Sequence, residues 1–178
     1  MASFHFNGFR GIVTLVKPKS GWGSTFPLST LKPEIVNIHG HYSAYGLEVA
    51  YVEAKVLQTV FGYTLESPNG TSLQKLRDPL YYSSQSKGLL FRSPPLPMNQ
   101  IDIDRSTFIA SLHALVHVIL HASLPFIGGQ IQEIGGLALL PQGYILLFDQ
   151  ATGSGVCAML LEHFPELFNR AFNILECD

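Results

Sequence analysis

Short apolar stretches separated by turn-forming residues run through the first half of the chain. Four of these stretches have the β-branched and aromatic content that is typical of strands, and they cover residues 11–16, 34–39, 47–61 and 87–92. A helix is the alternative for residues 47–61, which also contain helix-tolerant alanine, glutamate and lysine. Residues 17–30 are rich in proline, glycine and serine and are predicted to form a loop.

One long helix is predicted at the start of the second half. Asp104 or Ser106 can cap its first turn, and apolar residues recur at helical spacing as far as Ala122. Pro125 follows as a stop signal. Most of the helix circumference is apolar, so we expect the helix to be deeply buried. A single small and polar stripe remains on the helical wheel, made of Ser106, Ala110, His113, Ala114, His117 and His121.

An apolar hairpin and more helix follow. Residues 134–140 and 144–148 are apolar on both faces and flank a Pro-Gln-Gly turn, which predicts a largely buried hairpin. A glycine-rich turn over residues 149–155 leads into a helical pattern that continues to Glu176. Pro165 either bends this helix or begins a second one.

These elements predict an α+β fold. A β-rich part over residues 1–97 would pack on a helix–hairpin–helix part over residues 98–178, and the two would form one compact domain. Residues 93–97, Ser-Pro-Pro-Leu-Pro, are a stiff extended linker and mark the boundary between the two parts.

Composition narrows the possible functions. The chain has 178 residues, of which 47% are hydrophobic and only 13% are charged, and its formal net charge is -2. Part of the surface must therefore be uncharged, and such a surface is a candidate partner site. A domain that binds nucleic acid through phosphates alone is normally basic, so any nucleic-acid role should be local or shared with another polypeptide. No membrane span and no signal peptide are expected, which predicts a cytoplasmic protein.

The histidines of the long helix are the first candidate site. His113, His117 and His121 lie one turn apart and could share a metal ion or a carboxylate. Acid–base catalysis is a further alternative, and the structural interpretations are hydrogen-bonded core histidines or simply the more polar face of the helix. Glu133 and Asp149 are the candidate acid partners. We expect His113 and His117 to be buried in a polar cluster with these acids, and His121 to be exposed.

The turn after the hairpin is the second candidate site. A strand, a glycine-rich turn and a helix N-terminus can bind an anion, here through the backbone of Thr152, Gly153 and Gly155. No lysine follows the glycines, so this is not a Walker phosphate loop. The structural alternative is a tight connection in which Asp149 or Thr152 bonds the turn amides.

Two weaker candidates lie in the first half. The His39-Gly-His41 segment could bind a metal ion, or could carry ordinary surface histidines. Lys17, Lys19 and Trp22 lie in a small basic and aromatic loop that could stack a base or contact a phosphate, with an ordinary surface loop as the alternative. No nucleophile elbow, Cys-x-x-Cys pair or helicase motor motif is present, so no ATP hydrolysis is expected.

Five short motifs then follow one another in an order that resembles a known family. They are Ser111–His117, Glu133–Gly136, Ile145–Asp149, Gly153–Gly155 and Leu175–Cys177. This order resembles the C-terminal domain of YprA-like DEAD/DEAH-box helicases, the bacterial mitomycin-repair group, which is also called DUF1998 and recurs in some anti-phage defence proteins. The resemblance covers about residues 104–177.

The resemblance also implies a zinc site, but this sequence departs from the family pattern. Glu133 stands where an aspartate is usual, and the turn lacks the usual adjacent glycines. The family's four-cysteine cluster would begin at Cys177, so this residue is at most a remnant ligand and the zinc site is incomplete. Cys157, the other cysteine, lies in an apolar run and is interpreted as a core thiol.

The leading hypothesis is a non-catalytic accessory domain or subunit of a DNA helicase or defence complex. It would dock to a motor domain or subunit and help to hold nucleic acid. One alternative is a small metal-dependent hydrolase or nuclease that uses His113, His117 and Asp149. The other is a purely structural subunit that oligomerises through its apolar surface.

Overall fold

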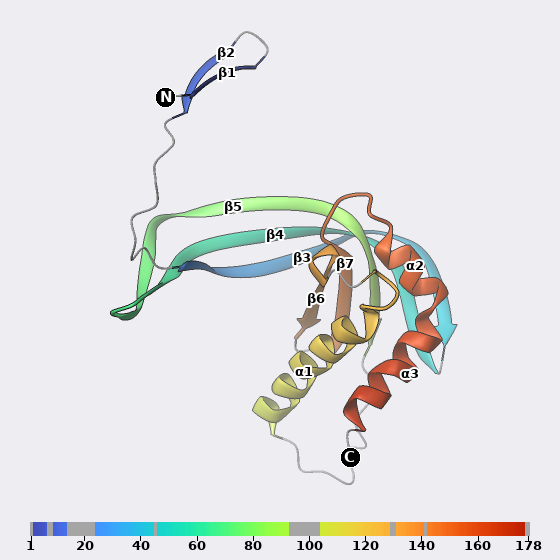
Figure 1. Ribbon diagram of the computed structural model, residues 1–178. Coiled ribbons are helices and arrows are strands. Elements are labelled where there is room, and N and C mark those ends of the chain that lie inside the picture. Colours follow the sequence, from blue (N-terminus) through green and yellow to red (C-terminus); the bar gives the residue numbers. More distant parts are fainter. Residues whose placement is uncertain are drawn as a thin grey trace. The chain divides into compact units, whose positions relative to one another are not determined.

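The computed structural model of the protein (Figure 1) describes residues 2–6, 9–13, 24–44, 46–92, 104–128, 131–140 and 142–176. The chain forms two compact units. Unit 1 comprises residues 1–30 and 59–81, and unit 2 comprises residues 31–58 and 82–178. Strands and helices are both present, with the helices in the second half of the chain, so the α+β prediction is confirmed.

Within the described ranges, seven strands form two sheets. A hairpin of β1 (Ala2–Phe6) and β2 (Phe9–Val13) stands by itself, and the other five strands form an antiparallel sheet in the order β3-β4-β5-β7-β6. The five strands are β3 (Ser24–Ala44), β4 (Leu47–Ser67), β5 (Gly70–Arg92), β6 (Ile134–Leu139) and β7 (Tyr144–Asp149). The predicted hairpin of β6 and β7 therefore extends the sheet of the first half, because β7 pairs with the end of β5.

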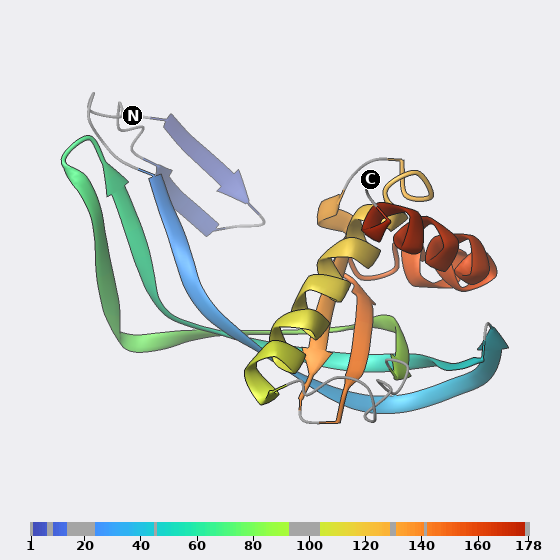
Figure 2. The same ribbon diagram turned by 90° about the horizontal axis from the view of Figure 1, so that it is seen from below.

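Three helices cover one face of this sheet in unit 2 (Figures 1 and 2). They are α1 (Arg105–Ser123), α2 (Val156–Glu162) and α3 (Phe164–Leu175), and a short 3-10 turn, Ile131–Glu133, precedes β6. Alternate residues of the strands point to this face, as the period of a strand requires. Together with the buried side chains of the helices they form one core, which includes Val49, Leu89, Phe91, Ile145, Leu147, Val116, Leu160 and Phe164.

The opposite face of the same strands carries a second apolar cluster. It contains the intervening residues of β4 and β7, and its buried members are Ala50, Val52, Ala54, Val56, Leu146 and Phe148. Two adjacent glycines of β6, Gly135 and Gly136, each leave room for a side chain on a different face of the sheet. A Cβ on Gly136 would lie 2.6 Å from Val116 of α1, and a Cβ on Gly135 would lie 2.4 Å from the Phe148 ring. The glycine pair thus allows a helix to pack closely on one face and an aromatic ring on the other.

The loop prediction for residues 17–30 is wrong from Ser24 onward, because β3 begins there. Pro27 lies within β3 and contributed to the loop prediction, but β3 is an edge strand, where a residue without an N–H is tolerated. Residues 14–23 lie outside the described part. Residues 47–61 form strand, not helix, and β5 extends far beyond the predicted residues 87–92.

The long helix begins and ends close to the prediction. Asp104 caps α1, and its Oδ1 accepts a hydrogen bond of 2.7 Å from the Thr107 N–H. The helix is not deeply buried, which corrects the expectation from its composition. Its buried residues are Leu112, Val116, Ile119, Ala122 and Ser123. By length and composition α1 could also cross a membrane, but helices that pack in soluble cores pass the same test.

Candidate functional site

The histidine ladder, defined as His113, His117 and His121, lies on the exposed face of α1. The predicted burial of His113 and His117 is therefore wrong. The buried side of α1 is the apolar stripe that contains Leu112, Val116 and Ile119, so the small and histidine stripe is left in solvent. His113 and His117 contact each other, with 3.1 Å between their Nε2 atoms and 4.6 Å between ring centroids. Among the described residues, no group of three or more His, Cys, Asp or Glu could hold a metal ion.

The exposed position of the ladder leads to a first prediction. Replacing His113 and His117 together with alanine should change the free energy of unfolding by no more than about 0.5 kcal/mol, because surface substitutions rarely do more. Urea unfolding followed by circular dichroism measures this value. A loss of several kcal/mol would mean that the two imidazoles hold buried partners after all.

Asp149 ends β7 as a buried carboxylate, only 2% exposed. Its Oδ1 accepts a hydrogen bond of 2.8 Å from the Cys157 N–H in the first turn of α2. The turn between them uses glycines in the left-handed region, with φ of +82° at Gly153 and +73° at Gly155. Asp149 therefore closes this turn by bonding an amide, as the structural alternative for the turn states. Thr152 is exposed together with these two glycines, and anion binding there stays a prediction.

Glu133 is tied to the same turn through its backbone. The Gln150 N–H donates to the Glu133 carbonyl oxygen at 3.0 Å, and the Gln150 side-chain amide donates to the Ile134 carbonyl oxygen at 3.4 Å. These bonds hold the ends of β6 and β7 together, where Ile134 pairs with Asp149. The acid residue before the glycine pair thus contributes to the turn by its main chain.

Two more titratable groups interact with Asp149, the buried Cys157 thiol and the partly buried Tyr51 hydroxyl. Burial raises the pKa of the Cys157 thiol far above its ordinary value, and the Asp149 carboxylate beside it raises that pKa further. Burial also raises the pKa of Tyr51, again with a contribution from Asp149. Cys157 is thus a protonated, buried thiol, which agrees with its interpretation as a core residue and makes it a poor nucleophile.

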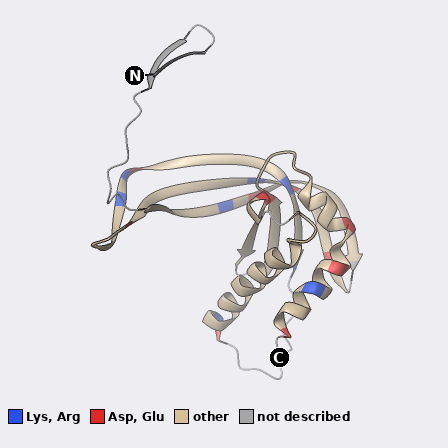
Figure 3. Cartoon of the chain, in the orientation of Figure 1, with Lys and Arg blue, Asp and Glu red and all other residues tan. Residues whose placement is uncertain are grey.

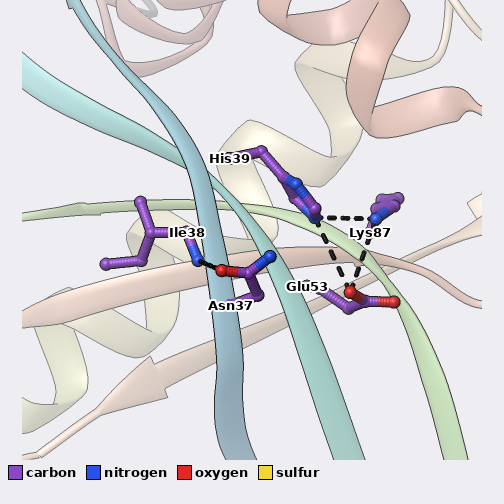
Figure 4. Close-up of polar contacts among 5 residues, drawn as sticks. All are labelled: Asn37, Ile38, His39, Glu53 and Lys87. Carbon is purple, nitrogen blue, oxygen red and sulfur yellow. Dashed lines mark hydrogen bonds and ion pairs between the residues drawn. The ribbon is translucent and has the colours of Figure 1, made fainter.

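A cluster that the sequence did not predict joins three neighbouring strands (Figure 4). The Lys87 Nζ of β5 lies 2.7 Å from the His39 Nε2 of β3, and both lie near one Glu53 oxygen of β4, at 3.6 and 3.7 Å. Lys87 can only donate, so His39 accepts through a neutral nitrogen. About a third of each side chain is exposed, so the cluster adds little stability. His41 is exposed, and no described group of side chains makes it a metal ligand.

A pocket of about 180 Å³ lies on the face of the unit 2 sheet opposite the helices. Its lining comes from four strands and from Gln150, which directly follows β7, and contains no charged residue: Leu31, Val56, Gln58, Tyr82, Ser84, Phe148 and Gln150. No sequence signal linked these residues, because the strands that bring them together are far apart in the chain.

Of the remaining predicted site residues, Lys17, Lys19, Trp22 and Cys177 lie outside the described part of the structure.

The fold of the chain is similar to that of part of a solved helicase structure. No protein-family profile and no curated protein matches the chain. A solved structure does match, that of a DUF1998 helicase, described as "Crystal Structure of DUF1998 helicase MrfA bound to DNA". The match has a TM-score of 0.59 at 15% identity and covers 87% of this chain and 22% of the helicase chain. The chain therefore has the fold of a part of that helicase and spans about a fifth of its length.

Proposed function

We propose that the chain is a non-catalytic accessory domain or subunit of a helicase, and that it docks to the motor through unit 1. The observation that carries this proposal is the apolar ribbon, defined as residues 24–30 and 59–81 of unit 1. Gly62 is the only buried residue in these two ranges. Large apolar side chains are exposed along the ribbon: Phe26 at 50%, Phe61 at 41%, Leu73 at 59%, Leu80 at 63% and Tyr81 at 69%. An apolar surface of this kind on a soluble protein usually contacts a partner.

The charge of the ribbon favours a protein partner over nucleic acid. Its charged residues are Glu66, Lys75, Arg77 and Asp78, two of each sign (Figure 3). A surface without a positive excess has no net attraction for phosphates. A motor subunit with an apolar, weakly charged patch would match both the apolar side chains and the balanced charge of the ribbon. A similar fold also forms part of a helicase chain, which supports a motor as the partner.

The same proposal also specifies the type of motor, the cellular compartment and the process. We infer a motor of the YprA-like mitomycin-repair type, working in the cytoplasm on DNA, in repair or in defence. The order of motifs from Ser111 to Cys177 supports this choice of motor. A metal-dependent hydrolase is less well supported, because His113, His117 and Asp149 do not form a group of metal ligands in the described structure.

Docking is tested with one ribbon variant and one matched control. Leu80→Asp places a charge in the ribbon at a side chain that is 63% exposed, and should weaken binding to the motor at least about tenfold. Leu175→Asp makes the same change at a side chain of α3 that is 57% exposed, and should leave binding unchanged. Neither residue is buried, so both variants should fold.

The measurement has two steps. The full-length chain, tagged, is purified from cells that produce it, and bound DEAD/DEAH-box helicases are identified by mass spectrometry. The affinity of each purified variant for that helicase is then measured by interferometry, together with the effect on unwinding rate. If no helicase binds, or if Leu80→Asp binds as well as Leu175→Asp, docking through the ribbon is wrong.

A further inference from the structure

We propose that His113 and His117 form a two-ligand site for a divalent transition-metal ion, such as Zn²⁺ or Cu²⁺, on the exposed face of α1. The two imidazoles lie one helical turn apart, and their Nε2 atoms are 3.1 Å apart. The site needs no contribution from the buried Asp149 and implies no hydrolase. It is also independent of docking through the ribbon, because α1 lies outside residues 24–30 and 59–81.

The separation of the two nitrogens is the one that a single metal ion requires. Zn²⁺ binds histidine nitrogen at about 2.0–2.1 Å. Two nitrogens that are 3.1 Å apart, each at that distance from one ion, subtend an angle of about 100° at the ion. This angle lies between about 90° for square-planar or octahedral coordination and about 109° for a tetrahedron. The helix therefore holds the pair close to the geometry that either type of ion prefers.

Both nitrogens are available to an ion. His113 and His117 are exposed, and within the described residues each Nε2 is bonded to the other Nε2. In that contact one neutral ring donates its Nε2 proton, since a neutral imidazole has one N–H. When an ion binds, this proton moves through solvent to the Nδ1 of the same ring, so no proton is gained or lost. A single hydrogen bond between exposed groups, which contributes little, is thus exchanged for two metal–nitrogen bonds.

The helix around the pair is uncharged. From Ser106 to Ser123, α1 contains no lysine, arginine, aspartate or glutamate (Figure 3), so no cation along the helix repels a metal ion. Ala110 and Ala114, which are exposed on the same stripe, are small and leave room around the ion. Two histidines fill two of the four positions that Zn²⁺ usually takes, so water takes the others in the isolated chain. The absence of carboxylates favours ions that prefer nitrogen over Mg²⁺ or Ca²⁺.

The test compares His113 with His121, the third imidazole of the ladder. His121 is also exposed and lies one turn beyond His117, but it takes no part in the 3.1 Å contact. Zn²⁺ and Cu²⁺ are titrated into the full chain by calorimetry, in a Cys177→Ser background so that this thiol cannot bind the ion. We expect His113→Ala to weaken the tightest site at least about tenfold, because the second ligand of a chelate acts at a high effective concentration. His121→Ala should leave the affinity unchanged. Alanine favours helix, so both variants should fold.

Two further measurements identify the ligands. Pulsed EPR of the Cu²⁺ complex should show two bound imidazoles in the unaltered chain and in His121→Ala, and fewer in His113→Ala. Zn²⁺ should raise the Tm of the first two proteins and not that of His113→Ala, because an ion that binds the folded state stabilises it. Equal effects of the two single variants, unchanged affinity in the double variant His113→Ala/His117→Ala, or fewer than two imidazoles in the unaltered chain would overturn the site. Docking through the ribbon is measured with Leu80→Asp, so the two proposals can fail separately.

Discussion

Replacing Phe91 with alanine is expected to lower the free energy of unfolding by about 3–5 kcal/mol, the usual cost of removing a buried phenylalanine ring. Phe91 is 1% exposed and lies near the end of β5, opposite Ile145 of β7. Its ring lies 5.5 Å from the rings of both Phe164 and Phe168, with edge-to-face angles of 75° and 77°. One side chain from the first half of the chain thus holds α3 on the sheet.

A loss of this size would remove a large part of the stability of a typical domain, which is about 5–15 kcal/mol. Urea unfolding followed by circular dichroism measures it. Phe172→Ala is the matched control, since that ring lies on α3 but is 56% exposed, and the expected change is within about 0.5 kcal/mol. Equal losses in the two variants would mean that α3 does not pack on the sheet through this aromatic cluster.

Phe91 also shows how far the sequence could predict the fold. Local signals were enough for α1 and for the hairpin: Asp104 caps the helix as predicted, and residues 134–140 and 144–148 correspond to β6 and β7. Nothing local indicated that β7 pairs with β5, because the paired residues are 52 to 60 positions apart and neither segment contains a signal for the other. The sequence therefore groups the hairpin with the helices of residues 98–178, whereas in the structure it belongs to the same sheet as β3, β4 and β5.

The side of α1 that faces the core was equally hard to predict. Apolar residues cover most of its circumference, so the pattern contains no clear polar face to assign to solvent. The residues of α1 that become buried include Leu112, Val116 and Ile119, and Val116 packs against Gly136 of β6, while the histidines remain exposed. The cluster of His39, Glu53 and Lys87 had no signal at all, since His39 and Lys87 are 48 positions apart.

Replacing Asp149 with alanine is expected to destabilise the protein by about 1–3 kcal/mol, because the buried Cys157 N–H would lose its acceptor. The effect should be concentrated at the start of α2. Hydrogen exchange of the Cys157 amide should become faster, while amides in the middle of β7 keep their protection. Asp149→Asn retains a side-chain oxygen that can accept the bond, so its loss should be smaller than that of alanine.

The reactivity of the Cys157 thiol beside Asp149 provides a second measurement. It depends on the pKa of the thiol and not on the stability of the protein alone. Asp149 is one cause of the raised pKa of Cys157, and burial is the larger one. In a Cys177→Ser background, Cys157 is the only thiol of the chain. Removing the carboxylate should bring its pKa closer to the ordinary value, so alkylation by iodoacetamide should be faster at alkaline pH in Asp149→Ala. Opening of the start of α2 would also speed the reaction, but at every pH, so the change in pKa is taken from the pH dependence of the rate, measured without denaturant. Unchanged stability together with an unchanged alkylation rate would show that the glycine-rich turn holds α2 without Asp149.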